Sequence, residues 1–179
     1  MNERHNDLSI WGIRKVNFDN AASVLDIGCG GGKNIANLTN IATNAKVFGV
    51  DYSPFSVATS KKHNKKSVKL GKVEVTVGSA ENLPYEDNAF DVITAFETVY
   101  FWDIEKAFVE VLRVLKSCGE FLIVNEAVNK EGLEELIEKI GFNVYSGEEL
   151  ENALKKAGFV SVELIRHENN KWIAVIAKK

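Results

Sequence analysis

The sequence has few of the residues that stabilise exported, metal-binding or membrane-spanning proteins. It contains two cysteines and three histidines, and no histidine stands at metal-ligand spacing from Cys29 or Cys118. No signal peptide precedes the cysteines, so we expect reduced thiols, a cytoplasmic location and no metal site. The longest apolar runs, residues 92–96 and 121–124, are much too short to cross a bilayer, and we expect no membrane partner.

Linker sequence and excess charge are also scarce. The chain has two prolines in 179 residues and no repeat or low-complexity tract, which predicts one compact domain over residues 1–179. The formal net charge is −3, so a general attraction to nucleic acid is not expected. One basic stripe stands near a predicted helix C-terminus and is interpreted as a solvated face. Its members are Lys61, Lys62, Lys65, Lys66 and Lys69, beside His63.

Short apolar runs rich in valine and isoleucine alternate with longer segments of helical periodicity. This pattern is typical of a parallel sheet with helices on both faces, so the predicted fold class is α/β. Five strands are predicted, at residues 24–27, 47–50, 73–77, 91–96 and 120–125. Two further strand-like runs, 160–165 and 172–177, are separated only by a short polar stretch and predict a terminal hairpin.

Helix start and stop signals stand between the predicted strands. The predicted N-caps are Ser53, which precedes Pro54, then Asp103, and Ser146, which has capping-box spacing to Glu149. The helix after Asp103 should run to about residue 116, and the helix after Ser146 should end near Gly158. A further helix is expected with its core over residues 131–140.

The strongest local pattern is the run Val-Leu-Asp-Ile-Gly-Cys-Gly-Gly-Gly-Lys-Asn at residues 24–34, where an apolar strand enters a glycine-rich turn. Glycine lets a ligand approach the backbone, and in open α/β sheets such loops stand where ligands bind. The dinucleotide fingerprint needs a third glycine where Lys33 stands, and a P-loop needs serine or threonine where Asn34 stands. Both classes are disfavoured, although an NAD-dependent oxidoreductase stays an alternative.

A carboxylate follows the second predicted strand. An ionised Asp51 accepts hydrogen bonds without donating any, so it matches a ribose diol and would repel the extra phosphate of NADP. Tyr52 beside it offers an apolar ring face for adenine. The alternative, that Asp51 only ends a strand or caps a turn, has less support because of the glycine loop upstream.

Together these residues resemble motifs I and II of the class I S-adenosylmethionine-dependent methyltransferases, with Asp26-x-Gly28-x-Gly30-x-Gly32 as the first and Asp51 as the second. Further blocks of that family are similar to residues 77–85, 88–93, 112–116 and 157–159, so the resemblance runs from about residue 22 to the C-terminus. It implies a Rossmann-like, doubly wound, seven-stranded sheet, mostly parallel with an antiparallel C-terminal strand and with helices on both faces. It also implies S-adenosylmethionine as methyl donor and S-adenosylhomocysteine as product.

The resemblance assigns cofactor-binding residues by position. The loop containing Asp26, Gly28, Cys29 and Gly30 would meet the methionine portion, chiefly through backbone groups, and Asp51 would meet the ribose. The residues flanking adenine would be Tyr52, Ser79 and Ala80. Ser79 departs from the family, which commonly has aspartate at that position. A hydroxyl can still accept a hydrogen bond from the adenine amino group.

The acceptor side is expected after the fourth strand, over residues 96–103. This segment lacks the Asn-Pro-Pro-Tyr pattern of amide and adenine N-methyltransferases and the Pro-Cys pair of cytosine-C5 enzymes. Tyr100, Phe101 and Trp102 could form an aromatic wall for a flat or cationic acceptor, or they could pack the next helix. Residues 126–145 are too short for a bulky recognition module, which favours a small-molecule acceptor or a site completed by a second subunit, as in a homodimer.

Two further expectations concern the acceptor side, one for the N-terminal segment and one for Glu97. Residues 1–22 would either fold over the cofactor as a lid that includes Trp11 or only cover a sheet edge. Glu97 interrupts an apolar stretch just beyond the fourth strand and is the candidate acid or base, or the partner of an ammonium group. The alternative is an exposed glutamate at the start of a loop. A noncatalytic protein that binds S-adenosylmethionine stays the third functional hypothesis.

Overall fold

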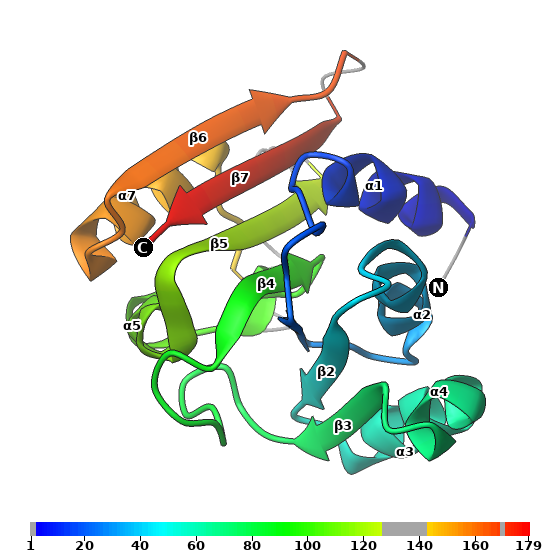
Figure 1. The fold of residues 1–179 in the computed structure, drawn as a ribbon. Coiled ribbons are helices and arrows are strands. Elements are labelled where there is room, and N and C mark those ends of the chain that lie inside the picture. The colour runs from blue at the N-terminus through cyan, green and yellow to red at the C-terminus, as the bar shows by residue number, and fades with distance from the viewer. Residues whose placement is uncertain (1–2, 127–142, 169–170) are drawn as a thin grey trace.

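The computed structural model describes residues 3–126, 143–168 and 171–179, and its centre is one twisted β-sheet (Figure 1). Within these residues the sheet has seven strands in the order β3-β2-β1-β4-β5-β7-β6. Their bounds are β1 Ser23–Ile27, β2 Lys46–Asp51, β3 Val73–Val77, β4 Phe90–Phe96, β5 Leu115–Glu126, β6 Ser161–Arg166 and β7 Trp172–Lys178. The first five strands are parallel, and β7 lies antiparallel between β5 and β6. The predicted fold class and the terminal hairpin are confirmed.

Helices cover both faces of the sheet and bury two separate apolar cores. The described helices are α1 Glu3–Ile13, α2 Lys33–Ile41, α3 Pro54–His63, α4 Lys65–Lys69, the short 3-10 helix η1 Val99–Phe101, α5 Ile104–Val114 and α7 Gly147–Ala157. One core joins α5 and α7 to the face that carries Phe121 and Ile123. The other joins α1, α2 and α3 to the face that carries Leu122 and Val124. Alternate residues of β5 therefore serve opposite cores, as expected for a strand buried on both sides.

The predicted helix caps are confirmed by hydrogen bonds. The Ser53 hydroxyl accepts from the Ser56 N–H at 3.3 Å, and the Asp103 carboxylate accepts from the Lys106 N–H at 3.4 Å. Ser146 and Glu149 form both bonds of a capping box. Gly158 ends α7 with a φ of 110°, a left-handed conformation that suits glycine. The expected helix over residues 131–140 lies outside the described residues.

One boundary was predicted wrongly. Helix α5 ends at Val114, and β5 begins at Leu115 rather than at residue 120. The added part of β5 is irregular, because Cys118 has a φ of 63° and the register with β4 shifts between Phe90 and Val92. Polar side chains and this irregularity remove the apolar pattern on which the strand prediction depended.

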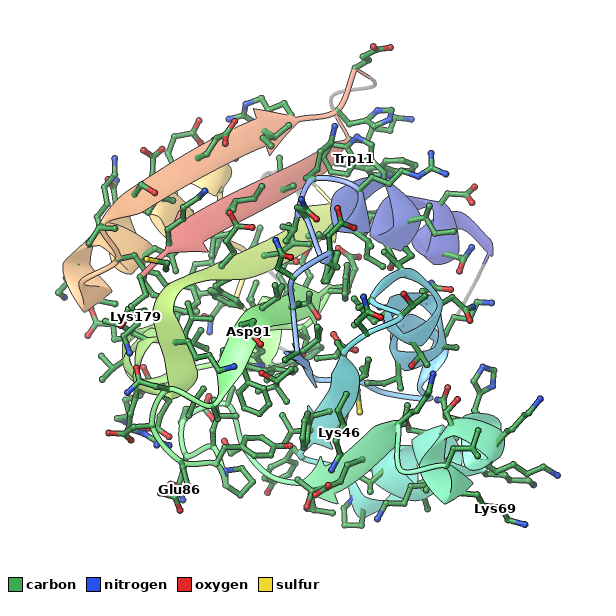
Figure 2. The ribbon with its side chains drawn as sticks, in the orientation of Figure 1. Trp11, Lys46, Lys69, Glu86, Asp91 and Lys179 are labelled. Atoms are coloured by element: carbon green, nitrogen blue, oxygen red, sulfur yellow. The ribbon has the colours of Figure 1, made fainter. Side chains whose placement is uncertain are left out.

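The N-terminal helix α1 packs on β5 and α2. Gly12 makes the close approach possible, because a Cβ at this position would collide with the Val124 side chain. The ring of Trp11 packs edge-on to His167, with centroids 5.2 Å apart, and lies 6.1 Å from the ring of Trp172. Figure 2 shows Trp11 beside the end of the β6–β7 hairpin where β6 ends and β7 begins. The described part of this segment covers the sheet, and a lid role stays a prediction.

The strand order reverses between β1 and β4, and this position determines where the site forms. β2 and β3 lie on one side of β1, whereas β4 and β5 lie on the other. Loops that leave β1 and β4 therefore diverge to opposite faces and open a crevice at the carboxyl ends of the strands. In the part of the chain that the structure describes, no helix is long and apolar enough to cross a membrane.

Candidate functional site

A cavity of about 590 Å³ lies at the carboxyl ends of the central strands. Its walls come from four segments that are far apart in the sequence, at residues 27–28, 51–53, 78–81 and 97–102. The first three follow β1, β2 and β3, and the fourth follows β4. The strand order therefore brings together the glycine loop, the acidic end of β2 and the expected acceptor segment.

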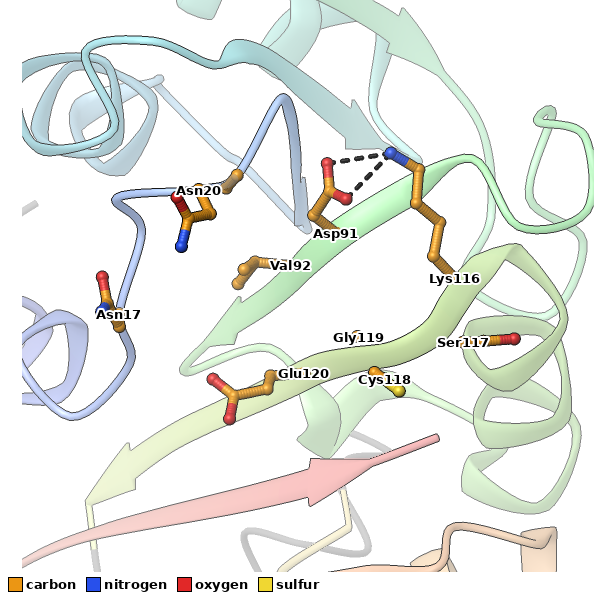
Figure 3. A pocket seen from close by; sticks show the side chains of 10 residues that line it. Asn17, Asn20, Asp91, Val92, Lys116, Ser117, Cys118, Gly119 and Glu120 are labelled. Carbon is orange, nitrogen blue, oxygen red and sulfur yellow. Dashed lines mark hydrogen bonds and ion pairs between the residues drawn. The ribbon is translucent and has the colours of Figure 1, made fainter.

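A second cavity, of about 300 Å³, lies at the opposite end of β4 and β5, and Figure 3 shows its polar lining. Asp91 lies on its wall and is paired with the Lys116 ammonium group at 2.9 Å. The same carboxylate accepts from the Ser23 hydroxyl at 2.8 Å and from the Ala22 N–H at 3.0 Å. Burial opposes ionisation of Asp91, but these donors hold its pKa below the usual range. These contacts give Asp91 a structural role, so the first cavity is the candidate site.

Asp51 ties the glycine loop to the end of β2. Its Oδ2 accepts from the Gly30 N–H at 2.8 Å, and its Oδ1 accepts from the Ser53 N–H at 2.9 Å. Each carboxylate oxygen has two acceptor sites, so both oxygens keep capacity for further donors. Gly30 has a φ of 50°, and a Cβ built there would meet nothing within 4 Å. The loop thus needs glycine for its backbone conformation and leaves open space beside it.

Of the predicted loop residues, Gly28 lines the cavity, whereas Asp26, Cys29 and Gly30 are not among its lining residues. Asp26 is 1% exposed, and its Oδ1 accepts from the Thr94 hydroxyl at 2.9 Å. Its Oδ2 has no hydrogen-bond partner among the described residues. Burial, opposed by the Thr94 hydrogen bond and aided by the Asp51 charge, raises the pKa of Asp26 to about 7. The Cys29 side chain is buried, so only its backbone is available to a ligand.

The loop after β3 contains a carboxylate that the sequence did not indicate. Glu81 lines the cavity, and its Oε2 accepts from the Ser79 hydroxyl. Its Oε1 accepts from the Asp103 N–H at 2.9 Å, at the start of α5. Because the Ser79 hydrogen is directed to Glu81, the hydroxyl oxygen presents lone pairs to any other partner. Glu81 therefore connects the predicted adenine side, with Ser79 and the buried Ala80, to the predicted acceptor side.

Glu97 lies on the cavity wall and is held by donors from two directions. Its Oε1 accepts from the Glu126 N–H at 2.5 Å and from the Tyr100 hydroxyl at 3.1 Å. Its φ of 55° is uncommon for a residue with a side chain, and such outliers concentrate at functional sites. Burial and the nearby Glu97 carboxylate both raise the pKa of Tyr100, so its hydroxyl stays protonated and able to donate.

The predicted aromatic wall is only partly formed by the residues named from the sequence. Trp102 is buried and lines the cavity together with the exposed Phe101, whereas Tyr100 is not among the lining residues. Trp11 is also not among them. Thr98, which the sequence did not indicate, also lines the cavity. Its side chain packs so close to Gly28 that a Cβ on Gly28 would collide with it. Gly28 therefore allows the segment after β4 to approach the glycine loop closely.

Comparisons with known proteins find methyltransferases. The family described as Methyltransferase domain matches residues 18–158. The O-methyltransferase cnsE of Penicillium expansum is 28% identical over 148 residues, which is 79% of this chain and 53% of that protein. The sterol 24-C-methyltransferase erg6 of Schizosaccharomyces pombe is 31% identical over 163 residues, covering 82% of this chain and 42% of that protein. The chain thus spans about half the length, or less, of these curated relatives.

A solved structure shares the fold at low sequence identity. It is the phosphoethanolamine N-methyltransferase 2 of Haemonchus contortus in complex with S-adenosyl-L-methionine. The TM-score is 0.82 at 19% identity, with 97% of this chain and 52% of that chain covered. At this identity the likeness establishes a common fold and nothing finer.

Proposed function

The chain belongs to the methyltransferase family, and from this premise we propose that it transfers a methyl group from S-adenosylmethionine to a small-molecule acceptor. The product of the donor would be S-adenosylhomocysteine. The curated relatives include O- and C-methyltransferases, one of them named for a sterol, which supports a small molecule as the acceptor. The observation that carries the proposal is that one cavity joins Gly28 and Asp51 to Glu97 and Trp102.

The polar and aromatic groups that line the cavity fit S-adenosylmethionine. Asp51 lies on the wall with acceptor capacity for the two hydroxyls of a ribose. The Ser79 oxygen can accept a hydrogen bond from an amino group, and the exposed ring of Tyr52 offers an apolar surface to a purine. The open space beside Gly30 suits the methionine portion, which the backbone of the loop from Asp26 to Gly30 would hold.

The same arrangement supports an in-line transfer. When bound, the cofactor supplies a methyl group on a positively charged sulfur, so the acceptor lone pair bonds the methyl carbon as the carbon–sulfur bond breaks. The protein's part is to align the acceptor with that carbon, which Trp102 and Phe101 would do as a wall of the cavity. Glu97, oriented by the Glu126 N–H and the Tyr100 hydroxyl, would accept a proton from the acceptor or pair with its ammonium group.

A cytoplasmic location and a homodimer stay parts of the proposal. Cys29 and Cys118 are both free thiols, which supports a reducing compartment. A second copy of the chain could complete the acceptor side, because residues 126–145 are a short connection. Sedimentation at several protein concentrations would show whether a dimer forms.

Two measurements test the function. Calorimetry should show binding of S-adenosylmethionine and S-adenosylhomocysteine and none of NAD, and a tritiated-methyl screen of metabolite pools should identify a labelled acceptor. Preferential binding of NAD would replace the proposal with the oxidoreductase. Binding without transfer to any pool would favour a noncatalytic protein.

Glu97→Gln then tests the acid or base role. The amide keeps the shape of the carboxylate but cannot take up the proton, so turnover should fall while cofactor affinity stays within about twofold. The expected loss is roughly a hundredfold or more, the usual contribution of a positioned base. Full activity of Glu97→Gln across the pH profile would leave alignment alone to explain catalysis.

A further inference from the structure

The charge of the chain is distributed unevenly. Residues 52–73 contain six lysines and no acidic residue or arginine, so the rest of the chain has nine more acidic than basic residues. These lysines, all exposed, are Lys61, Lys62, Lys65, Lys66, Lys69 and Lys72. The first acidic residue after the segment, Glu74, is paired with Lys46 at 2.8 Å. Helices α3 and α4 thus form a basic corner on a chain whose other residues carry a net negative charge.

Exposed apolar side chains gather in the same part of the chain. Among the described residues eight large hydrophobic side chains are exposed, and four of them lie between positions 52 and 77. These are Tyr52 at 83%, Phe55 at 81%, Leu70 at 66% and Val77 at 48% exposure. Single exposed hydrophobic residues need no explanation, but a group of them next to a basic stripe indicates an interaction surface.

The spacing within α3 places both kinds of side chain on one face. Val57 and Ser60 are buried against the sheet, whereas Phe55, Thr59 and Lys62 recur at helical spacing on the outward side. Figure 1 shows α3 and α4 side by side at the β3 edge of the molecule, and Figure 2 shows Lys69 directed outward there. Tyr52 stands two residues before the start of α3 and lines the cavity. The N-terminal end of α3 therefore borders the candidate site, and the lysines begin in its last turn.

We propose that the basic corner formed by α3, α4 and the adjoining exposed apolar residues docks on an anionic phospholipid surface. This proposal replaces two expectations from the sequence, that the lysine stripe is only a solvated face and that the chain has no membrane partner. Lysines close to such a surface are attracted by its negative potential, and aromatic rings such as those of Tyr52 and Phe55 settle at the level of the headgroups. Helix α3 presents Phe55 and Lys62 outward, and α4 adds Lys65, Lys66 and Lys69, so the lysines would supply most of the attraction. Docking in this way would turn the side of the cavity that Tyr52 lines toward the lipid.

Nucleic acid is the other polyanion that a basic stripe could bind, and the corner fits it less well. Arginine is the residue that recognises phosphate in a bidentate manner, and residues 52–73 have none. The net negative charge of the rest of the chain would also oppose a nucleic acid that extended beyond the corner. The apolar side chains among the lysines favour a headgroup layer with hydrocarbon beneath it.

Co-sedimentation with vesicles tests the proposal. The full chain should bind vesicles that contain phosphatidylglycerol at least tenfold more tightly than vesicles of phosphatidylcholine alone, and added salt should weaken this binding. The double variant Lys62→Glu with Lys66→Glu should lose more than tenfold in vesicle affinity, and Phe55→Ser should lose several-fold. Matched controls are Lys156→Glu on α7 and Val160→Ser, an exposed lysine and an exposed apolar residue outside the corner.

The outcomes separate clearly. Equal binding to both vesicle types, losses of the same size in the control variants, or tighter binding to a single-stranded RNA than to the anionic vesicles would overturn the proposal. Circular dichroism of the same preparations checks that each variant is folded, and calorimetry with S-adenosylhomocysteine separately measures cofactor binding. Because the docking proposal does not depend on the proposed function, vesicle binding without cofactor binding would contradict only the latter.

Discussion

Two aspartates on neighbouring strands show how differently the two ends of the sheet are built. Asp91 on β4, at the amino end, is surrounded by Lys116, Ser23 and two backbone N–H groups, and these donors lower its pKa. Asp26 on β1, toward the carboxyl end, is buried with one oxygen unpartnered among the described residues, and its pKa is raised to about 7. At the amino end the polar groups around Asp91 are hydrogen-bonded to one another. At the carboxyl end the burial of Asp26 opposes folding with an ionised carboxylate, and functional sites often retain such unfavourable groups.

The largest effect should come from filling the open space at the carboxyl end. Gly30→Val should abolish binding of S-adenosylhomocysteine, because a branched side chain would occupy the ligand's volume and oppose the positive φ. Gly71 is a matched control, since it too has a positive φ and no atom within 4 Å of a built Cβ, but it lies between α4 and β3, whereas the Gly30 N–H donates to the cavity-lining Asp51. Gly71→Val should lose about as much stability as Gly30→Val but should bind S-adenosylhomocysteine with unchanged affinity. Equal affinities of the two variants in calorimetry would show that the ligand lies elsewhere.

The buried Asp26 should make stability depend on pH. The folded state keeps its proton up to about pH 7, whereas the unfolded chain releases it near 3.8, so stability should fall as pH rises between these values. The loss would be about 4 kcal/mol, an order-of-magnitude figure from roughly 1.4 kcal/mol per pKa unit. Asp26→Asn should remove this dependence, and urea unfolding of both proteins at several pH values measures it. Parallel stability curves for the two proteins would contradict the assignment.

Asp51→Ala should weaken S-adenosylhomocysteine binding several-fold to a hundredfold. The reason is the loss of charge-assisted hydrogen bonds to the ribose, which are worth roughly 1.5–3 kcal/mol. Calorimetry measures the affinity, and circular dichroism checks that the fold survives loss of the bonds to Gly30 and Ser53. An intact variant with unchanged affinity would remove Asp51 from the ligand site.

The smallest effect is expected at the amino end. Asp91→Asn should lower the free energy of unfolding by about 1 kcal/mol near neutral pH, because the Lys116 pair is partly exposed and screened by solvent. With a lowered folded pKa, the stability contributed by Asp91 is present above pH 3.8 and is lost as the pH falls through the folded value. Ligand affinity should stay within about twofold. A marked loss of affinity would show that the two ends of the sheet are coupled.

The fold class, the succession of strands and helices along the chain and the helix caps could be predicted from the sequence alone. These depend on contacts between near neighbours and on the period of apolar residues, which are visible in a linear pattern. The same is true of the glycine loop and Asp51, because both stand directly after predicted strands. The first residues of β5 were not predicted to be a strand, because Cys118 and its polar neighbours interrupt that pattern.

Which side chains share the cavity could be seen only in the folded structure. It placed Glu81 between Ser79 and the start of α5, and it turned Cys29 inward and left Trp11 beside Trp172. Glu97 is oriented by the Glu126 N–H, 29 positions away in the sequence. Such contacts follow from how the strands and helices pack, and no local spacing encodes the direction in which a loop side chain finally points.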